Sequence, residues 1–311
     1  MTHAGTRLEN VGSRAQAPAR LAVIVNRSAG DGRAGRALPE VEAALAQRQL
    51  TYHVETTQSL AHAGELARAA LAAGETAVAF GGDGLIGAVA DALKYTDGTL
   101  GVLPGGRGND FARMLGIPLQ PGAACEVLRS GVVRSLDLGE VGSKTFSGIA
   151  SCGFDSDANR IANETRIVRG TLVYAYGALR ALARWRPATF QVTIDGGEPR
   201  TVTGYSVAAA NSKVFGGGML LAPEASLEDG LLDVVTISEM PRRRFLRLLP
   251  TVFKGEHVRY RDVVEVQRAT RLSISADRPF TVYADGEAIG ELPVTVRALP
   301  GAVRALVPAR S

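Results

Sequence analysis

The first half of the chain alternates short apolar runs with segments of helical spacing. The runs with strand-like composition are residues 21–26, 51–57, 76–80 and 99–104, and residues 76–80 have the length and composition of a buried strand. The segments between them that repeat apolar residues at helical spacing are residues 33–49, 62–74 and 85–94. Strands separated by helix-sized segments are typical of βαβ units. We therefore expect an α/β domain with a parallel sheet over residues 19–145.

The pattern changes after about residue 145. Two helical segments, 155–163 and 172–185, are followed by short β-type runs that turn residues separate. These runs are residues 189–195, 201–211, 231–238, 271–276, 280–286 and 294–299. Their spacing is typical of a β-sandwich, so we expect a β-rich domain over residues 146–292. Residues 1–18 are polar and rich in small side chains, which predicts a flexible tail.

Composition narrows the class of partner. The 46% of apolar residues supports a well-buried core, and the net charge of +4 suits an anionic substrate or a membrane surface. Only 5% of residues are aromatic and none interleave with basic residues, so we expect no nucleic-acid binding. No apolar run approaches the ~18 residues that span a bilayer, and no signal-peptide pattern is present. The two isolated cysteines suit a reducing cytoplasm, where any membrane contact would be peripheral.

A glycine-rich turn follows the strand at residues 76–80. Gly82, Gly84 and Gly87 match the G-x-G-x-x-G pattern of dinucleotide-binding proteins. However, Asp83 lies inside the turn, where it would repel a pyrophosphate held only by backbone amides. A divalent cation between carboxylate and phosphate removes that repulsion, so Asp83 favours Mg-nucleotide chemistry. The alternative is a tight turn in which Asp83 caps its own helix.

Two more glycine-bearing loops follow predicted strands. The loop after residues 99–104 leads into a helix that Asn109 or Asp110 would cap, and Arg107 adds a charge suited to an anion. The loop after the first strand, residues 26–36, brings Asn26 and the backbone amides of residues 28–32. Parallel strands place such loops at one edge of the sheet, where ligands bind. Ordinary turns are the alternative for each loop alone.

The order of these motifs resembles a known family. GGDG after a buried strand, followed about two dozen residues later by GNDFAR, is similar to the diacylglycerol kinase catalytic family and its sphingoid-base relatives. NAD kinases and phosphofructokinases share GGDG but not GNDFAR. The similarity continues through CGFDSDAN, FGGGMLLAPEASLEDGLLDVV and VYADGE, and it covers nearly all residues from about 20 onward. It is strongest to the soluble bacterial diacylglycerol kinases, notably those of actinobacteria.

The resemblance implies Mg²⁺ and ATP as cofactors and assigns candidate residues. The implied nucleotide contacts are Asn26, Ser28, Gly30, Thr57, Gly81, Gly82, Asp83, Gly84, Gly106, Arg107, Asn109 and Asp110. The implied metal site is formed by Ser226, Asp229 and Leu231. The implied catalytic residues are Glu287 as general base, Asp285 beside it, and Asp83. The resemblance also implies that strands of residues 293–311 pack back on the first domain.

Two of these motifs have a plainer interpretation. Asp229-Gly230 and Asp285-Gly286 are also strong turn signals. Asp195-Gly196 is a third such pair and serves as an internal comparison.

Two departures concern the nucleotide. The family usually has threonine where this chain has Leu85, and again where it has Arg107. Arg107 supplies a charge in place of one hydroxyl, whereas Leu85 supplies no polar group.

Residues 241–259 combine arginines with leucine and phenylalanine. Such a segment either lies on anionic lipid or is a surface helix with its apolar face in the core.

Taken together, these features predict a lipid kinase that phosphorylates diacylglycerol to phosphatidic acid at the inner face of a membrane. The alternatives are another lipid acceptor (a sphingoid base, ceramide or phosphatidylglycerol), an inactive binding protein, or a nicotinamide-dependent oxidoreductase. The oligomeric state stays open, a homodimer included.

Overall fold

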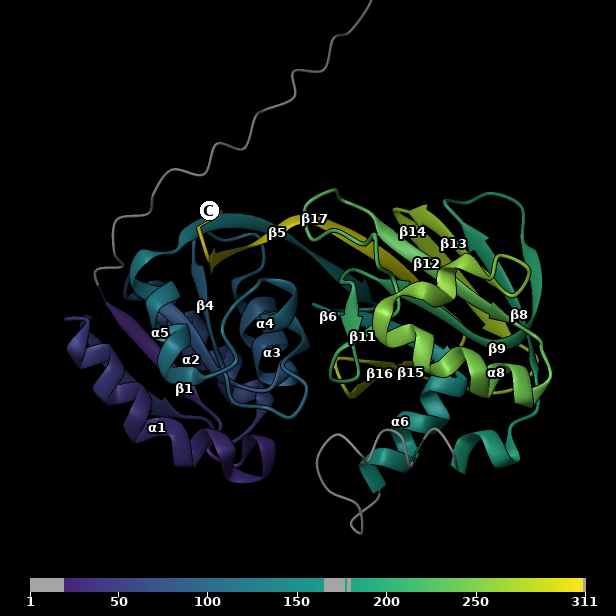
Figure 1. Ribbon diagram of the computed structural model, residues 1–311. Coiled ribbons are helices and arrows are strands. Elements are labelled where there is room, and N and C mark those ends of the chain that lie inside the picture. Colours follow the sequence, from purple (N-terminus) through teal and green to yellow (C-terminus); the bar gives the residue numbers. More distant parts are fainter. Residues whose placement is uncertain (1–19, 165–176, 178–179, 310–311) are drawn as a thin grey trace, which may run out of the picture.

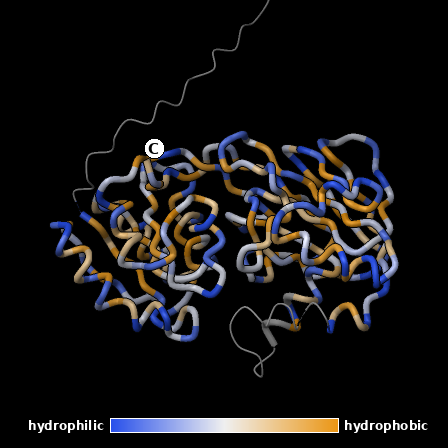
Figure 2. Tube along the Cα trace, in the orientation of Figure 1, coloured by the Kyte–Doolittle hydropathy of each residue, from blue (hydrophilic) through white to orange (hydrophobic). Residues whose placement is uncertain are grey.

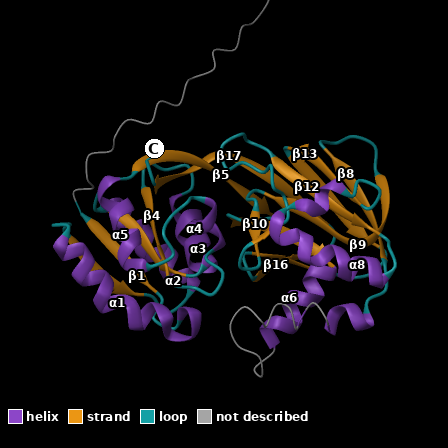
Figure 3. Cartoon of the chain, in the orientation of Figure 1, coloured by secondary structure: helices purple, strands orange, loops and turns teal. Residues whose placement is uncertain are grey.

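The structure is a computed structural model that describes residues 20–164, 177 and 180–309 (Figure 1). Its elements form two lobes, one rich in helices and one rich in strands (Figure 3). The predicted tail, residues 1–18, lies outside the described residues, and so does much of the helix predicted over 172–185.

The first lobe is built on four parallel strands in the order β4-β3-β1-β2. The strands are β1 (Leu21–Val25), β2 (Tyr52–Thr56), β3 (Thr76–Gly81) and β4 (Thr99–Pro104). The helices of this lobe are α1 (Ala29–Gln47), α2 (Leu60–Ala72), α3 (Asp83–Leu93), α4 (Asp110–Met114) and α5 (Pro121–Ser130). Every residue of β1 and β3 is buried, because helices cover both faces of a parallel sheet.

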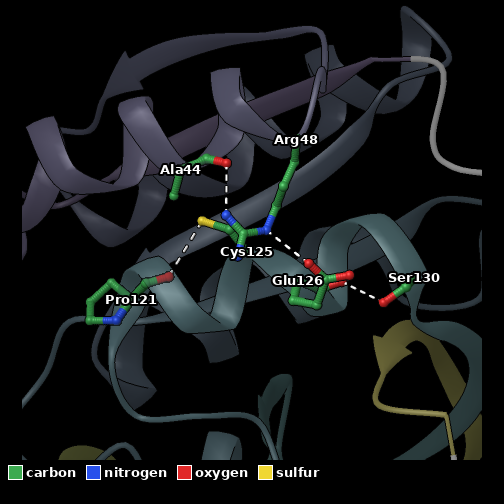
Figure 4. Close-up of polar contacts among 6 residues, drawn as sticks. All are labelled: Ala44, Arg48, Pro121, Cys125, Glu126 and Ser130. Carbon is green, nitrogen blue, oxygen red and sulfur yellow. Dashed lines mark hydrogen bonds and ion pairs between the residues drawn. The ribbon is translucent and has the colours of Figure 1, made fainter.

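Helix α5, which the sequence pattern did not predict, packs against α1 (Figure 4). Arg48 follows the last residue of α1, donates to the Ala44 carbonyl at 3.0 Å and pairs with Glu126 of α5, Nε to Oε2, at 3.0 Å. Between the two helices lies Cys125, whose thiol donates to the Pro121 carbonyl at 3.4 Å. Burial raises the pKa of this thiol to about 11. Cys125 therefore stays protonated and serves as packing for the two helices.

The second lobe consists mainly of antiparallel strands. Its strands are β6 (Lys144–Phe146), β7 (Ile149–Gly153), β8 (Ala188–Ile194), β9 (Arg200–Ala210), β10 (Val214–Phe215), β11 (Met219–Leu220), β12 (Leu232–Ser238), β13 (Val264–Ala269), β14 (Arg271–Ala276), β15 (Thr281–Ala284) and β16 (Glu287–Glu291). Its helical elements with assigned bounds are α6 (Phe154–Glu164), α8 (Arg242–Leu248), and the 3₁₀ helices η1 (Leu249–Lys254) and η2 (Glu256–Arg259).

Each lobe has its own hydrophobic core, and apolar positions run along the strands of both (Figure 2). The second core contains a ring cluster in which Tyr205 stacks on Phe245 with centroids 4.2 Å apart. Phe154 meets Phe245 edge to face at 4.9 Å and Trp185 at 5.7 Å. These contacts tie α6 and α8 to β9.

Two long strands connect the lobes. β5 (Val132–Val141) and β17 (Val294–Val307) pair with each other in antiparallel fashion over nearly their whole length. The start of β17 also pairs with β14 of the second lobe, and its residues Arg304 and Ala305 pair in parallel with β4 of the first. Leu138 belongs to the first core and Val141 to the second. The final strand therefore completes the sheet of the first lobe.

The sequence pattern mispredicted several elements. The strand β7 and the end of β6 lie between residue 145 and α6, where the pattern indicated that helices come first. β13 was missed because polar residues at its exposed positions interrupt the apolar run. The basic segment of residues 241–259, for which a surface helix was one interpretation, is α-helical only from Arg242 to Leu248. The chain then tightens into 3₁₀ turns, beginning with Leu249 and Pro250.

Candidate active site

The two central glycine loops lie side by side at the carboxyl edge of the parallel sheet. Gly81 of β3 pairs with Pro104 of β4, and the Gly105 amide donates to the Gly81 carbonyl at 2.7 Å. A side chain at Gly106 would put its Cβ 2.5 Å from the Cα of Gly82, which no backbone tolerates. These glycines therefore allow the two loops to meet backbone to backbone.

The loop after β1 packs against the loop that follows β4. Asn26 closes this loop, because its Oδ1 accepts from the amide of Ser28 at 3.1 Å and from its hydroxyl at 2.7 Å. Three left-handed residues follow, with φ of 62° at Gly30, 59° at Asp31 and 80° at Gly32. A Cβ at Gly30 would lie 2.6 Å from the Gly105 carbonyl oxygen, so this glycine too is required by a close approach.

Arg107 does not point freely at the cleft, because it pairs with Asp31 of the first loop. Its NH2 lies 2.6 Å from Asp31 Oδ1 and its Nε 3.3 Å from Oδ2. Arg33 reaches across in the other direction and donates to the Gly106 carbonyl at 3.0 Å. The two side chains of the Arg107–Asp31 pair are 41% and 57% exposed, so the pair contributes about 0–1 kcal/mol. A phosphate can therefore compete with Asp31 for Arg107.

The predicted caps of α4 are wrong. Asn109 occupies the N-cap position, but its side chain turns back, accepting from the Gly106 amide at 2.8 Å and donating to the Gly106 carbonyl at 3.2 Å. The Phe111 amide of α4 instead donates to Oδ1 of Asp83 at 3.0 Å. Asp83 is thus the first residue of α3 and an acceptor for a neighbouring helix, not a cap of its own. Burial raises the pKa of Asp83, and the amides of α4 oppose that rise.

Two other predicted positions are buried. Leu85 is 3% exposed and would touch any side chain at Gly81, so it fills the space beside β3 rather than facing the loops. Thr57 is 8% exposed at the end of β2, and its hydroxyl donates to the Ser59 carbonyl at 2.6 Å. Thr57 is therefore engaged in its own turn.

Asp110 joins the two lobes. Its carboxylate oxygens accept from the amide of Gly217, in the second lobe, at 3.0 and 3.1 Å. Burial, and secondly the charge of Asp83, raise the pKa of Asp110 to about 6. The sequence pattern offered Asp110 as a helix cap and gave no sign of this contact between the lobes.

Asp285 accepts hydrogen bonds from three donors through its carboxylate. It lies in the turn between β15 and β16, with φ of 52°, and its carboxylate accepts from the Ser147 amide at 2.7 Å, the Ser147 hydroxyl at 3.0 Å and the Gly148 amide at 2.9 Å. Burial first, and then the charge of Asp83, raise the pKa of Asp285 to about 7. A Cβ at Gly87 of α3 would lie 3.7 Å from Oδ2, so Asp285 also reaches the first lobe.

The Asp195-Gly196 turn, which serves as the comparison, has the backbone geometry of the Asp285-Gly286 turn but different surroundings. Its φ is 50°, and its Oδ1 accepts from the amides of Thr270 and Arg271 at 2.9 and 2.8 Å. Burial is the largest single effect and acts to raise the pKa of Asp195, but the hydrogen bonds from Thr270 and Arg271 together outweigh it, so this pKa is lowered. The two Asp-Gly turns therefore differ in burial and in what they face, not in hairpin geometry.

Glu287 begins β16 directly after the Asp285-Gly286 turn. The side chain is exposed and lies over the start of α3, where a Cβ at Gly84 would be 3.7 Å from its Cγ and 3.8 Å from its Oε1. This places a carboxylate of the second lobe beside the glycine turn of the first. The candidate base and the candidate nucleotide loops therefore come from different lobes and meet at one point.

A cleft between the lobes contains three of the predicted acidic residues. Asp83, Asp110 and Asp285 line it together with Gly108, Ser147 and Tyr283. Phe215 lines this cleft and also a second, apolar pocket, whose other walls include Phe154, Ile237, Phe245 and Val252. An acidic site beside the glycine loops thus adjoins an apolar pocket of the strand-rich lobe, with Phe215 between them.

The predicted metal residues lie elsewhere. Ser226 Oγ accepts from the Glu228 amide at 3.2 Å, and Asp229 Oδ1 accepts from the Leu231 amide at 3.1 Å, so both shape a turn. Asp137 lies beside them and accepts from the Gly230 amide at 2.7 Å. Among the described residues, no three His, Cys, Asp or Glu side chains are grouped as a metal cluster. The available donors are carboxylate and backbone oxygens, the kinds that Mg²⁺ prefers.

The sequence interpretation missed several residues that build the site. Asp31, Asp137, Ser147 and Gly217 each bond to a residue that the motifs had singled out. Their partners lie 76, 93, 138 and 107 positions away along the chain. Only GGG at residues 216–218 was visible as a signal, within the longer segment that carried the resemblance.

The raised pKa values predict a stability that falls as pH rises. Asp110 has its pKa raised to about 6, so the folded protein keeps a proton between about pH 4 and 6 that the unfolded chain releases. The stability due to this group is complete below about pH 4 and is lost as pH passes 6. Since each pKa unit is worth about 1.36 kcal/mol, the loss is up to about 3 kcal/mol.

Denaturant unfolding of wild type and Asp110→Asn from pH 4 to 7.5 measures this effect. The asparagine keeps an acceptor for the Gly217 amide but does not titrate, so its curve should be flatter. Equal slopes for the two proteins would contradict the assignment. Asp285, with a pKa raised to about 7, remains in both proteins and should leave a residual slope of the same sign.

Comparisons with known proteins define the class. A family model described as the diacylglycerol kinase catalytic domain matches residues 20–141. A second, described as the YegS C-terminal NAD kinase beta sandwich-like domain, matches residues 148–307. A putative diacylglycerol kinase from Bacillus anthracis has the same fold, with a TM-score of 0.79 and 21% identity over 94% of this chain and 98% of that one. The predicted fold class is thus confirmed, and the protein is a kinase.

Relatives at higher identity specify the family. A diacylglycerol kinase of Mycobacterium tuberculosis is 36% identical over 93% of this chain and 95% of its own length. A probable YegS-like lipid kinase of Pseudomonas aeruginosa is 35% identical over 88% of this chain and 91% of its own. The chain belongs to the diacylglycerol kinase and YegS-like lipid kinase family. The resemblance seen in the motifs is confirmed, and membership of a kinase family implies the use of ATP. No described helix has the length and apolar character to cross a bilayer.

Proposed function

We propose that the protein transfers the γ-phosphate of Mg-ATP to the free hydroxyl of diacylglycerol, giving phosphatidic acid and ADP. The hydroxyl oxygen attacks the γ-phosphorus while the bond to the bridging oxygen of the β-phosphate breaks. The hydroxyl proton passes to the carboxylate of Glu287. The observation that carries the proposal is the position of Glu287, which the second lobe holds over the glycine turn of the first.

The nucleotide would bind along the carboxyl edge of the parallel sheet. Backbone amides of the loops after β1, β3 and β4 converge there, and the required glycines let a phosphate approach the backbone closely. Arg107 would exchange Asp31 for phosphate oxygens in a charge-assisted contact. The residues assigned to the nucleotide remain Asn26, Ser28, Gly30, Thr57, Gly81, Gly82, Asp83, Gly84, Gly106, Arg107, Asn109 and Asp110.

Three side chains in that set would act indirectly. The Thr57 hydroxyl and the Asn109 amide are used within their own loops, so they would set the shape of the site rather than touch phosphate. Asp83 holds α4 in place through the Phe111 amide. Leu85 adds no ligand, and its burial shows that this position contributes packing instead.

Mg²⁺ would neutralise phosphate charge as it does in other phosphoryl transfers. A second, structural ion is proposed at the turn formed by Ser226, Asp229 and Leu231. There only Oδ1 of Asp229 accepts a hydrogen bond from a described residue, which leaves Oδ2 for an ion, and Asp137 lies beside the turn. Carboxylate and backbone oxygens of this turn would hold the ion. It would stabilise the contact with β17, since Asp137 also accepts from the Gly301 amide at 2.7 Å.

The acceptor would place its acyl chains in the apolar pocket reached past Phe215 and its hydroxyl in the acidic cleft. Because such a substrate resides in a bilayer, the protein would work as a peripheral protein at the inner face of the membrane, where ATP is present. The name of the Mycobacterium tuberculosis relative supports diacylglycerol as acceptor. The name of the Pseudomonas aeruginosa relative leaves other lipids open.

A lipid panel tests the proposal. Transfer of labelled γ-phosphate to diacylglycerol, a sphingoid base, ceramide and phosphatidylglycerol is measured in mixed micelles at graded Mg²⁺. Phosphatidic acid as the main product is the expected result. A strong preference for another lipid would show that diacylglycerol is not the acceptor, but it would leave the proposed mechanism of phosphoryl transfer unchanged. In the same assay Asp229→Asn should need more Mg²⁺ for half-maximal rate, and an unchanged Mg²⁺ requirement would remove the second ion.

A further inference from the structure

The segment from α8 through η1 forms one wall of the apolar pocket. Phe245, Leu248 and Val252 line the pocket and are 6%, 8% and 8% exposed. They recur at three- and four-residue spacing, which keeps them on one face of the segment. Leu249 lines the pocket as well. This face explains why the basic segment packs on the core, but it leaves Leu246 and Phe253 outside the pocket.

The opposite face is exposed and carries large apolar side chains. Leu246 is 42% exposed and Phe253 is 57% exposed, and Tyr260 just after η2 is 42% exposed. The described residues contain six large apolar side chains that are 37–61% exposed, of which two lie within this segment and a third, Tyr260, follows it closely. Such grouping, rather than scattered single residues, marks a surface that contacts something apolar.

Cations surround these exposed side chains. Arg242 donates to the Trp185 carbonyl at 2.7 Å, and Arg244 pairs with Asp262 at 2.7 Å, so these two arginines stabilise the fold. Arg243, Arg247 and Lys254 are exposed and have no ion pair or hydrogen bond with any residue that the structure describes. Three cations without partners beside leucine and phenylalanine complement a surface that is negatively charged and apolar underneath.

We propose that the outer face of α8–η1, formed by Arg243, Leu246, Arg247, Phe253 and Lys254, docks on an anionic phospholipid bilayer. The apolar side chains enter the acyl boundary and the cations pair with lipid phosphates. This inference rests on the proposed lipid acceptor. The docking face would also give the lipid a direct route from the bilayer to the site, because the inner face of the same segment lines the acyl pocket. A lipid leaving the bilayer at this place passes into the pocket without crossing water.

Vesicle binding tests the docking face with the full chain. Vesicles of phosphatidylcholine with phosphatidylglycerol are compared with phosphatidylcholine alone by sedimentation. Arg243→Glu/Arg247→Glu should weaken binding to the anionic vesicles by about 30-fold, since each cation at the surface contributes about five-fold. Leu246→Ser/Phe253→Ser should weaken it at least ten-fold. The matched controls, Arg68→Glu/Arg129→Glu and Tyr95→Ser, alter exposed residues of the first lobe and should bind as wild type does.

Activity with two forms of acceptor separates docking from catalysis. The docking variants should keep wild-type rates on monomeric short-chain diacylglycerol and lose at least ten-fold on long-chain diacylglycerol in anionic vesicles. If diacylglycerol is not phosphorylated in any form, the proposed acceptor fails while vesicle binding still measures docking. Unchanged vesicle binding in both docking variants, or equal losses in the controls, would overturn the inference. Lipid-free self-association that Leu246→Ser/Phe253→Ser abolishes would also overturn it, because the face would then be a protein contact.

Discussion

Replacing Glu287 with glutamine is expected to lower phosphoryl transfer by about 100-fold or more while leaving the fold intact. A positioned general base contributes about 10²–10⁴-fold, and glutamine keeps the size of the side chain but cannot take the hydroxyl proton. Glu287 is exposed, so its loss should change the free energy of unfolding by less than about 0.5 kcal/mol. Steady-state kinetics should show the loss in kcat, with KM for ATP nearly unchanged.

Glu291 provides the matched control for Glu287. It lies at the far end of the same strand, β16, and its Oε1 accepts from the Thr281 hydroxyl at 2.7 Å. Glu291→Gln should keep full activity, because an amide oxygen still accepts that hydrogen bond. An active Glu287→Gln protein would require another base, and Asp285 would be the nearest carboxylate to examine.

Replacing Asp285 with alanine is expected to lower both stability and activity. The Ser147 and Gly148 amides would lose their acceptor in a buried place, where an unpaired donor costs about 1–3 kcal/mol. Loss of a buried charge with a raised pKa offsets part of that, so we expect a net loss of about 2–4 kcal/mol. The turn that aims Glu287 would also loosen, and a shift of about 1 Å costs on the order of 10²-fold in rate.

The comparison turn makes the Asp285 result interpretable. Asp195→Ala removes a carboxylate with the same backbone geometry and a similar set of hydrogen bonds, but one that is exposed and lies outside the acidic cleft. Chemical unfolding and kcat are measured for both variants. Asp195→Ala should keep wild-type kcat. If both variants lose the same stability and neither loses activity, Asp285 is only a turn residue.

The sequence was informative where a pattern is local. Apolar runs located β1, β3 and β4, because strands buried on both faces are continuously apolar, whereas β2 was located by its strand-like composition, although it is not fully buried. The order of strand, glycine loop and helix was enough to place two loops at one edge. By contrast, β13 alternates with polar residues, and α5 was hidden because its small residues, Gly122 and Ala123, blur the helical period.

The site residues were harder to interpret because their partners are distant in sequence. Asp83 was weighed as a metal or phosphate residue or a cap of α3, whereas its direct bond is to an amide of α4. The two Asp-Gly turns look identical as dipeptides, and only the tertiary contacts of Asp285 with Ser147 and Gly148 separate them. Arg107 was interpreted as a free cation, and its partner Asp31 became visible only when two loops met. Hydrogen bonds of this kind depend on the fold and not on a motif.

The strand β17 gives the chain an order of assembly. Five of its last residues, Ala302, Val303, Ala305, Leu306 and Val307, are at most 2% exposed within the core of the first lobe. The first lobe therefore lacks part of its interior until residues 302–307 have been synthesised. Domains usually fold from the N-terminus as they emerge. Here the helix-rich lobe depends on β17, which follows the whole strand-rich lobe in the chain, so a nascent chain cannot complete the first core before the second lobe has been synthesised.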